Sequence, residues 1–173
     1  GFTGIGTTVA LLDTGVDASH PFLRGRVLPG IDVVDPGGDA SARPHPSVAD
    51  RRERHGTELA GLVVGGRRGI AFSGVAPGAA LLPVRVAGWQ PDARGDVAIY
   101  ARTDQLLAGL EAAVDPDGNG DAHDAARVAV VGVAEPFAAF AEGPLARAAA
   151  GALALNTLVV APVGNDGPAG PSY

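Results

Sequence analysis

The sequence predicts a three-layer α/β/α protein built on a mainly parallel sheet. Four short runs of almost wholly apolar residues alternate along the chain with segments of helical periodicity. Strands that are apolar on both faces are typical of a parallel sheet that helices cover on each side. In such a sheet the connections are right-handed crossovers, and functional groups gather at the carboxyl ends of the strands.

Each element follows from a local pattern. In chain order, the apolar runs predict strands at residues 8–12, 80–86, 128–133 and 157–163. The helical patterns cover residues 57–64, an amphipathic stretch at 96–114, and an Ala-rich stretch at 143–156. Asp96 is expected as the N-cap of the second helix, and Pro144 stands in the first turn of the third. Residues 35–50 and 115–124 are rich in Pro, Gly and Asp and predict loops.

Composition excludes several classes of function. The 173 residues suffice for one compact domain, and their formal net charge of −6 argues against nucleic acid as the main partner. The chain has no cysteine, which excludes a disulfide framework and a thiolate metal site. No window of about 18 residues is free of polar or charged side chains, so no membrane-spanning helix is expected.

Two short stretches carry candidate functional groups. Asp13 ends the first predicted strand and precedes Thr14-Gly15, a sequence that, taken alone, more often forms a turn than a functional site. His55 stands in Arg54-His55-Gly56, at the expected start of a helix. The zinc motif HExxH is absent, so a zinc role for this histidine is not expected. These stretches alone leave open whether Asp13 is a turn former or a placed charge.

Taken in order, the motifs resemble those of the subtilisin family of serine proteases. Asp13-Thr-Gly is followed by His55-Gly-Thr, by Gly-Val-Ala-Pro-Gly-Ala at residues 74–79, and by Val-Gly-Asn-Asp-Gly at residues 163–167. The resemblance runs from about Gly4 to the end of the chain and implies a subtilisin-like fold. It also implies polypeptide substrates.

The resemblance implies a role for three polar side chains. Asp13 matches the acid of the family's catalytic triad, His55 its general base, and Asn165 the side chain that donates a hydrogen bond to the oxyanion. Acyl transfer by a serine needs a base to take the hydroxyl proton and a carboxylate to orient that base. A neutral amide aimed at the developing oxyanion lowers the barrier further.

The family's nucleophilic serine, in a Gly-Thr-Ser segment, has no match among these residues. The serines present, none in that context, are Ser19, Ser41, Ser47, Ser73 and Ser172. Residues 1–173 are therefore expected to be the N-terminal portion of one subtilisin-like peptidase domain. We expect the isolated chain to be inactive, with the remainder of the domain, which carries the serine, as its partner. An incomplete sheet with an open edge also predicts self-association of the chain.

The strand segment that binds substrate in the family aligns with Gly132, Val133 and Ala134. Its main-chain groups suit pairing with an extended peptide, because such pairing needs no particular side chain. Ala134 replaces a glycine of the family pattern and adds a methyl group to the wall of the specificity pocket. Glu135-Pro136 follows at the rim and favours basic substrate residues.

The acidic loop predicts a separate, structural calcium site. Oxygen-bearing side chains at alternate positions, with glycines between them, suit a cation that takes six to eight oxygen ligands. The position of the bidentate glutamate of an EF-hand loop is taken by Ala126, so the match covers only the first part of that motif. A solvated acidic turn is the alternative. The candidate ligands are Asp115, Asp117, Asn119, Asp121 and Asp124.

The leading hypothesis is thus that the chain is the N-terminal part of a secreted, calcium-assisted subtilisin-like serine endopeptidase. Two alternatives stay open at this stage. One is a pseudoprotease with the same fold that has lost its nucleophile. The other is a calcium-stabilised α/β binding module, which predicts that Asp13 and His55 lie far apart.

Overall fold

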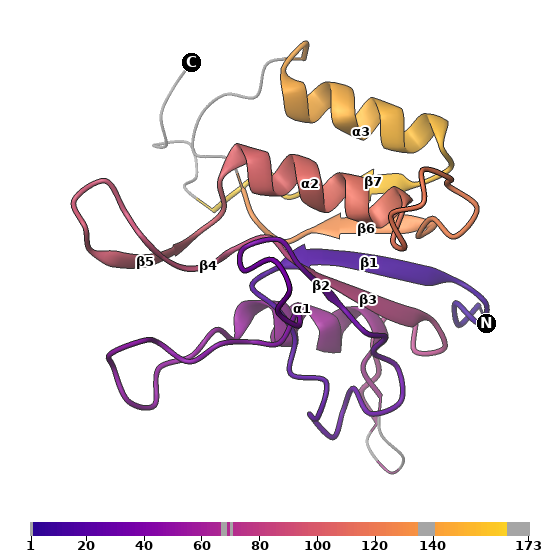
Figure 1. Cartoon of the computed structure of the whole chain (residues 1–173). Helices are drawn as coiled ribbons and strands as arrows, with labels where there is room; N and C mark the ends of the chain where they lie inside the picture. Colours follow the sequence, from indigo (N-terminus) through magenta and orange to yellow (C-terminus); the bar gives the residue numbers. More distant parts are fainter. Residues whose placement is uncertain (1, 67–68, 70, 135–140, 166–173) are drawn as a thin grey trace.

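Five parallel strands form the central sheet, in the spatial order β2-β3-β1-β6-β7 (Figure 1). This computed structural model describes residues 2–66, 69, 71–134 and 141–165. The strands are β1 (Thr8–Asp13), β2 (Ile31–Asp32), β3 (Ala80–Arg85), β6 (Val128–Val131) and β7 (Leu158–Val160). The first strand in sequence, β1, is therefore central in the sheet.

Helices cover both faces of this sheet, as the sequence predicts. Helix α1 (His55–Val64) lies on one face, and α2 (Thr103–Val114) and α3 (Pro144–Ala154) lie together on the other (Figure 1). The side chains of β1 alternate between two cores, as the two-residue period of a strand requires. Leu11 packs in the core beneath α1, while Leu12 packs in the core beneath α2. The three-layer α/β/α architecture is confirmed.

The start of the second helix differs from the prediction. Residues 88–100 form an antiparallel hairpin of β4 (Gly88–Pro91) and β5 (Val97–Tyr100), and α2 begins only at Thr103. Asp96 is therefore not an N-cap: its backbone carbonyl accepts a hydrogen bond from the Asp92 N–H in the hairpin turn. The Asp92 side chain and the left-handed backbone of Gly95 (φ 85°) stabilise this turn. These turn residues and the β-branched Val97 and Ile99 oppose continuation of a helix.

The other elements lie where they were predicted, with shifted ends. The first helix begins two residues earlier than predicted, at His55. Strands β6 and β7 are shorter than predicted and end at Val131 and Val160. The short strand β2 was not predicted, because two residues carry no detectable periodicity.

Strand β7 lies at one end of the sheet and has exposed apolar side chains. Leu158 and Val160 are about half exposed, and so are Leu153 and Leu155 at the end of α3. In the described part of the chain no strand pairs with the outer side of β7, so this edge of the sheet is open and apolar. Among the described residues, no helix has the length and apolar character needed to cross a bilayer.

Candidate active site

The carboxylate of Asp13 is buried at the carboxyl end of the central strand. Its residue is only 1% exposed, and its Oδ1 accepts a hydrogen bond of 2.6 Å from the backbone N–H of Thr14. Gly15 then takes the left-handed conformation (φ 88°), and a side chain there would collide with the backbone of Ser41. The Asp-Thr-Gly sequence thus does form a tight turn, and the turn directs the carboxylate inward rather than into solvent.

His55 meets that carboxylate from the first turn of α1. Its Nδ1 lies 2.8 Å from Asp13 Oδ2 and 3.1 Å from Oδ1. A carboxylate only accepts hydrogen bonds, so Nδ1 carries a proton, and in the neutral tautomer with this contact Nε2 is the acceptor. The histidine side chain is 56% exposed, whereas Asp13 beneath it is sealed from water. The hypothesis of a binding module with these two residues far apart is therefore wrong.

Two further hydrogen bonds join the Asp-Thr-Gly turn to the His-Gly-Thr segment. The Gly56 N–H donates to Thr14 Oγ1 (3.1 Å), and the Asp17 N–H donates to Thr57 Oγ1 (2.9 Å). Gly56 is needed because a Cβ there would overlap the carbonyl oxygen of Gly15. Three consecutive residues of the second motif, at positions 55–57, are thus bonded to the first motif, which lies some 40 residues earlier in the chain.

The environment of Asp13 affects its protonation. Burial raises its pKa above the ordinary value of 3.8, while the hydrogen bond from Thr14 and the nearby His55 imidazole act in the opposite direction. The carboxylate therefore depends on these two partners to remain charged in a dry site. An imidazolium at His55 would in turn be stabilised by that charge.

The predicted substrate segment and Asn165 follow the strands next to β1. Gly132 comes directly after β6 and lies against Asp13, and its N–H donates to the Leu12 carbonyl (2.9 Å). That N–H is therefore used within the sheet. A methyl group added at Gly164 would lie 3.5 Å from the Cβ of Ala134, which brings the exposed Asn165 beside the segment. Glu135-Pro136 lies outside the described residues.

The acidic loop brings only part of its predicted ligand set together. Carboxylate oxygens of Asp115, Asp117 and Asp124 lie within 4.8 Å of one another. Asp124 Oδ1 is buried and has no hydrogen-bond partner in the described structure. Asp121 is not in this cluster, and its Oδ1 accepts from the His123 N–H. Local bonds also occupy oxygens of the other loop residues: Asn119 Oδ1 accepts from the Asp121 N–H, and Asp115 and Asp117 accept from the Asn119 N–H.

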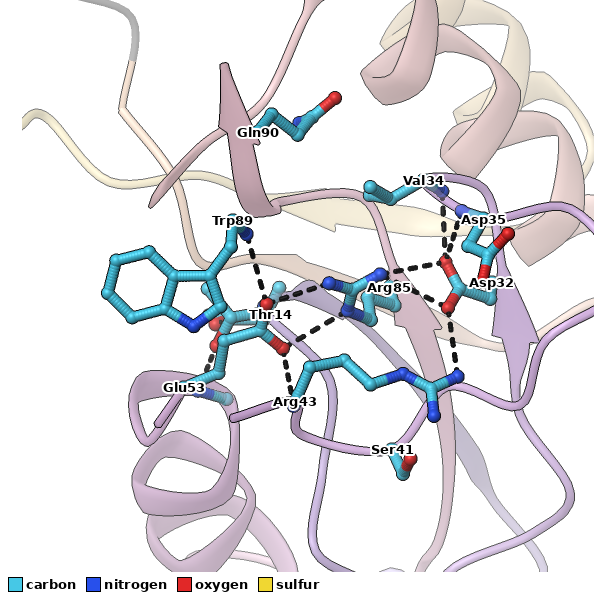
Figure 2. A network of polar contacts seen from close by, with 12 residues as sticks. Thr14, Asp32, Val34, Asp35, Ser41, Arg43, Glu53, Arg85, Trp89 and Gln90 are labelled. Atoms are coloured by element: carbon cyan, nitrogen blue, oxygen red, sulfur yellow. Dashed lines mark hydrogen bonds and ion pairs between the residues drawn. The ribbon is translucent and has the colours of Figure 1, made fainter. Parts of the chain in front are cut away.

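A buried ionic network beside the site was missed by the sequence analysis. Figure 2 shows the guanidinium of Arg85, at the end of β3, between the carboxylates of Asp32 and Glu53. All three residues are at most 6% exposed. Burial alone favours the neutral guanidine, but the bonds and charges of Glu53 and then Asp32 raise the pKa of Arg85. An arginine in an otherwise apolar strand was a detectable signal, since a buried charge needs partners.

A second polar pair at the foot of α2 was also missed. The side-chain amides of Gln90 and Gln105 bond each other reciprocally, at 2.9 and 3.2 Å, and Gln105 Oε1 also accepts from the Arg102 N–H. This pair fastens the β4–β5 hairpin to the start of α2. No local pattern in the sequence indicates a pairing over 15 residues.

Comparison with known proteins places the fold and the motifs in one family. The family model described as "Subtilase family" matches residues 4–173. The chain belongs to the subtilase family. The resemblance inferred from the motifs and the subtilisin-like α/β fold are both confirmed.

The subtilase relatives are longer than this chain. Subtilisin BL of Lederbergia lenta is 35% identical over 173 residues, which cover 100% of this chain and 53% of that protein. A calcium-dependent protease of Nostoc sp. is 37% identical over 84 residues, which cover 47% of this chain and 12% of that protein. A solved protease of Pseudoalteromonas arctica superposes with a TM-score of 0.67 at 26% identity, covering 95% of this chain and 51% of its own.

The chain thus spans about half the length of Subtilisin BL. Other subtilase relatives carry the names of a minor extracellular protease and a major intracellular serine protease, both of Bacillus subtilis.

Proposed function

We propose that this subtilase chain is the N-terminal portion of the catalytic domain of a serine endopeptidase that hydrolyses peptide bonds with an Asp-His-Ser triad. The single observation that carries the proposal is the 2.8 Å contact between the buried Asp13 carboxylate and His55 Nδ1. A generic structural ion pair would not need a half-exposed imidazole held on a sealed carboxylate. That arrangement leaves Nε2 facing outward as a base.

In the proposed mechanism, His55 takes the proton of the attacking serine at Nε2 and later gives it to the leaving amine. Asp13 keeps Nδ1 protonated, so that Nε2 has the lone pair, and stabilises the imidazolium that forms. The serine attacks the scissile carbonyl and forms an acyl-enzyme, which water then hydrolyses with His55 again acting as base. Asn165 donates to the oxyanion in both steps.

The segment of Gly132, Val133 and Ala134 is the proposed site of substrate pairing. It follows β6 directly, beside Asp13, and the Asn165 segment runs next to it. Because the Gly132 N–H is bonded to Leu12, pairing with a peptide uses the remaining main-chain groups of the segment.

The nucleophile comes from the remainder of the domain. We propose that this part covers the exposed edge at β7 and brings its serine to Nε2 of His55. The isolated chain then has no attacking group and is inactive, and its apolar edge leads it to self-associate.

A structural Ca²⁺ ion fits three residues of the acidic loop. Asp115, Asp117 and Asp124 place carboxylate oxygens within 4.8 Å of one another, and a buried, unpartnered Oδ1 of Asp124 supplies an unused acceptor. Three carboxylates so close repel one another unless a cation lies between them. The ion would cross-link the end of α2 to the segment before β6, and the name of the Nostoc relative is in keeping with a calcium dependence.

Secretion is the proposed location of the whole protein. The names of the subtilase relatives include both extracellular and intracellular proteases, so the names alone do not decide between the two locations. The calcium site favours the extracellular alternative, because calcium is abundant there.

Hydrolysis of a chromogenic peptide by the full-length protein tests the proposal. His55→Ala is expected to abolish turnover, whereas His20→Ala is expected to keep it, because His20 is an exposed histidine whose Nδ1 accepts only a local bond from Phe22. A folded full-length protein without turnover on any peptide library would instead favour a pseudoprotease.

A further inference from the structure

The start of α1 is held at two neighbouring points of the sheet. Asp13 and Arg85 are register partners at the carboxyl ends of the adjacent parallel strands β1 and β3. Their side chains point to the α1 face, as do those of Leu11 and Leu81 two and four residues earlier. Asp13 binds His55, and Arg85 binds Glu53, two residues before it.

The contact between Arg85 and Glu53 is a bidentate one. Arg85 Nη2 donates to Glu53 Oε1 (2.7 Å), and Nε donates to Oε2 (3.1 Å). The third guanidinium nitrogen, Nη1, donates to both oxygens of Asp32, at 3.1 and 3.2 Å. Such a planar, two-pronged contact fixes orientation as well as distance, which a lysine ammonium does not do.

The Glu53 carboxylate also bonds the loop before α1 and the strand β4. Its Oε2 also accepts from the Arg43 N–H (2.8 Å) and its Oε1 from the Trp89 N–H (3.2 Å), as Figure 2 shows. The Glu53 N–H in turn donates to the Arg43 carbonyl (2.9 Å). The chain entering α1, the long loop before it and the β4 strand therefore meet at one buried carboxylate.

Helix α1 receives no side-chain anchor from its N-cap residue. Its N-cap position, Arg54, makes no side-chain capping bond, although the first turn of a helix leaves backbone N–H groups that such bonds usually satisfy. The position of His55 is set instead by the bonds at residues 53, 56 and 57 and by Asp13 itself.

We propose that Arg85 is a positioning residue for the histidine: acting through Glu53, it fixes the backbone that carries His55 and thereby keeps the imidazole on Asp13. The catalytic consequence rests on the proposed protease function, whereas the geometric consequence does not. Arg85 itself touches neither substrate nor the reacting atoms in this assignment.

The test uses Arg85→Lys in the full-length protein, with Arg26→Lys as the matched control. Arg26 is a partly buried arginine whose Nε donates to the Pro77 carbonyl (2.9 Å), and no contact joins it to the segment at Glu53. We expect Arg85→Lys to lower kcat by about 10- to 100-fold with KM unchanged, because a displacement on the order of 1 Å in a catalytic group has that effect. Arg26→Lys is expected to change neither constant.

A second readout reports the His55–Asp13 contact without turnover. The Nδ1 proton in this charge-assisted hydrogen bond gives a low-field NMR signal, assigned by its loss in His55→Ala. We expect Arg85→Lys to shift or broaden that signal and Arg26→Lys to leave it in place. If the wild-type protein shows no hydrolysis, the protease proposal fails and the signal alone decides the present inference.

Glu53→Gln provides an independent route to the same result. It keeps the shape of the side chain while weakening the contact with Arg85, and it replaces Arg85→Lys as the deciding variant if the latter does not fold. Because both residues act as one unit, the double variant is expected to be no worse than the poorer single variant. Two results would overturn the proposal. One is that the losses in kcat of the Arg85 and Glu53 variants add up in the double variant. The other is that these variants have the same kcat and the same proton signal as Arg26→Lys.

Discussion

Replacing Gly56 with alanine tests whether the close approach of α1 to the Asp13 turn determines the site. A Cβ at this position would overlap the Gly15 carbonyl oxygen and lie 3.1 Å from Asp13 Oδ1. The first obstacle is backbone, which cannot rotate away as a flexible side chain would. The helix has to move outward, and it carries His55 with it.

The magnitude follows from two opposing effects. Alanine improves helix propensity over glycine by at most about 1 kcal/mol, while overpacking of this kind costs about 1–3 kcal/mol. Gly61→Ala, on the same helix, is the control, because its added Cβ would meet only Phe22 Cδ1 at an ordinary 3.7 Å. The difference between the two variants in the free energy of unfolding is therefore expected to be about 1–3 kcal/mol, with Gly56→Ala the less stable.

Denaturant unfolding and peptide hydrolysis by the full-length protein measure both consequences. We expect Gly56→Ala to lose about 100-fold in kcat, since the imidazole is displaced from its carboxylate, and Gly61→Ala to retain wild-type turnover. Equal unfolding midpoints and equal turnover in the two variants would refute the reasoning. In that case the space above the turn does not set the position of α1.

Three further predictions concern charge, metal and buried polar groups. Asp13→Asn is expected to lower kcat about 10⁴-fold. Because burial raises the pKa of Asp13, ionising its carboxyl group lowers the stability of the wild type as pH rises through that pKa. The variant should therefore have the higher thermal stability at neutral pH, and the difference should disappear on acidification below the ordinary value of 3.8. A wild-type advantage at neutral pH would contradict this sign. Chelation of Ca²⁺ should lower the melting temperature of the wild type and of Asp121→Asn but not that of Asp124→Asn; an equal response of all three would exclude the proposed ligand set. Gln105→Leu should lower the free energy of unfolding by about 1–3 kcal/mol, measured by denaturant titration, because it removes both hydrogen bonds between the buried amides and leaves Gln90 only its bonds to the Tyr100 carbonyl and to Arg102; an unchanged midpoint would show that these remaining bonds suffice.

The sheet and its helices could be predicted because apolar runs report directly on burial. Residues 8–12 and 80–86 contain few polar side chains, and they form the adjacent central strands β1 and β3. The stretch at 96–114 was assigned wholly to a helix because its periodicity outweighed the turn signal at Arg94-Gly95. The hairpin there depends on contacts with distant residues, among them the bond from the Trp89 N–H to Glu53.

The candidate site was predictable for a different reason. Asp13 and His55 belong to short motifs whose order and spacing identify a family, so their meeting could be expected without any knowledge of the packing. The motifs assign no role to Arg85, Asp32 or Glu53: the register of β2 and β3 places Asp32 beside Arg85, and the chain entering α1 brings Glu53 to it. For the acidic loop, the spacing of the residues suggested five ligands, whereas the folded loop brings three of the four carboxylates together and leaves Asp121 outside the cluster.

The central place of β1 has a consequence for how the chain folds. Val9 pairs with Leu81 on one side and with Val128 on the other, so β1 can complete its pairing only with two partners far along the chain. Pairings over such separations incur a large loop-closure entropy before they bring any gain, and they slow folding. Asp13 ends this strand, so its carboxylate is sealed from water only once β3, β6 and the start of α1 have all packed around it.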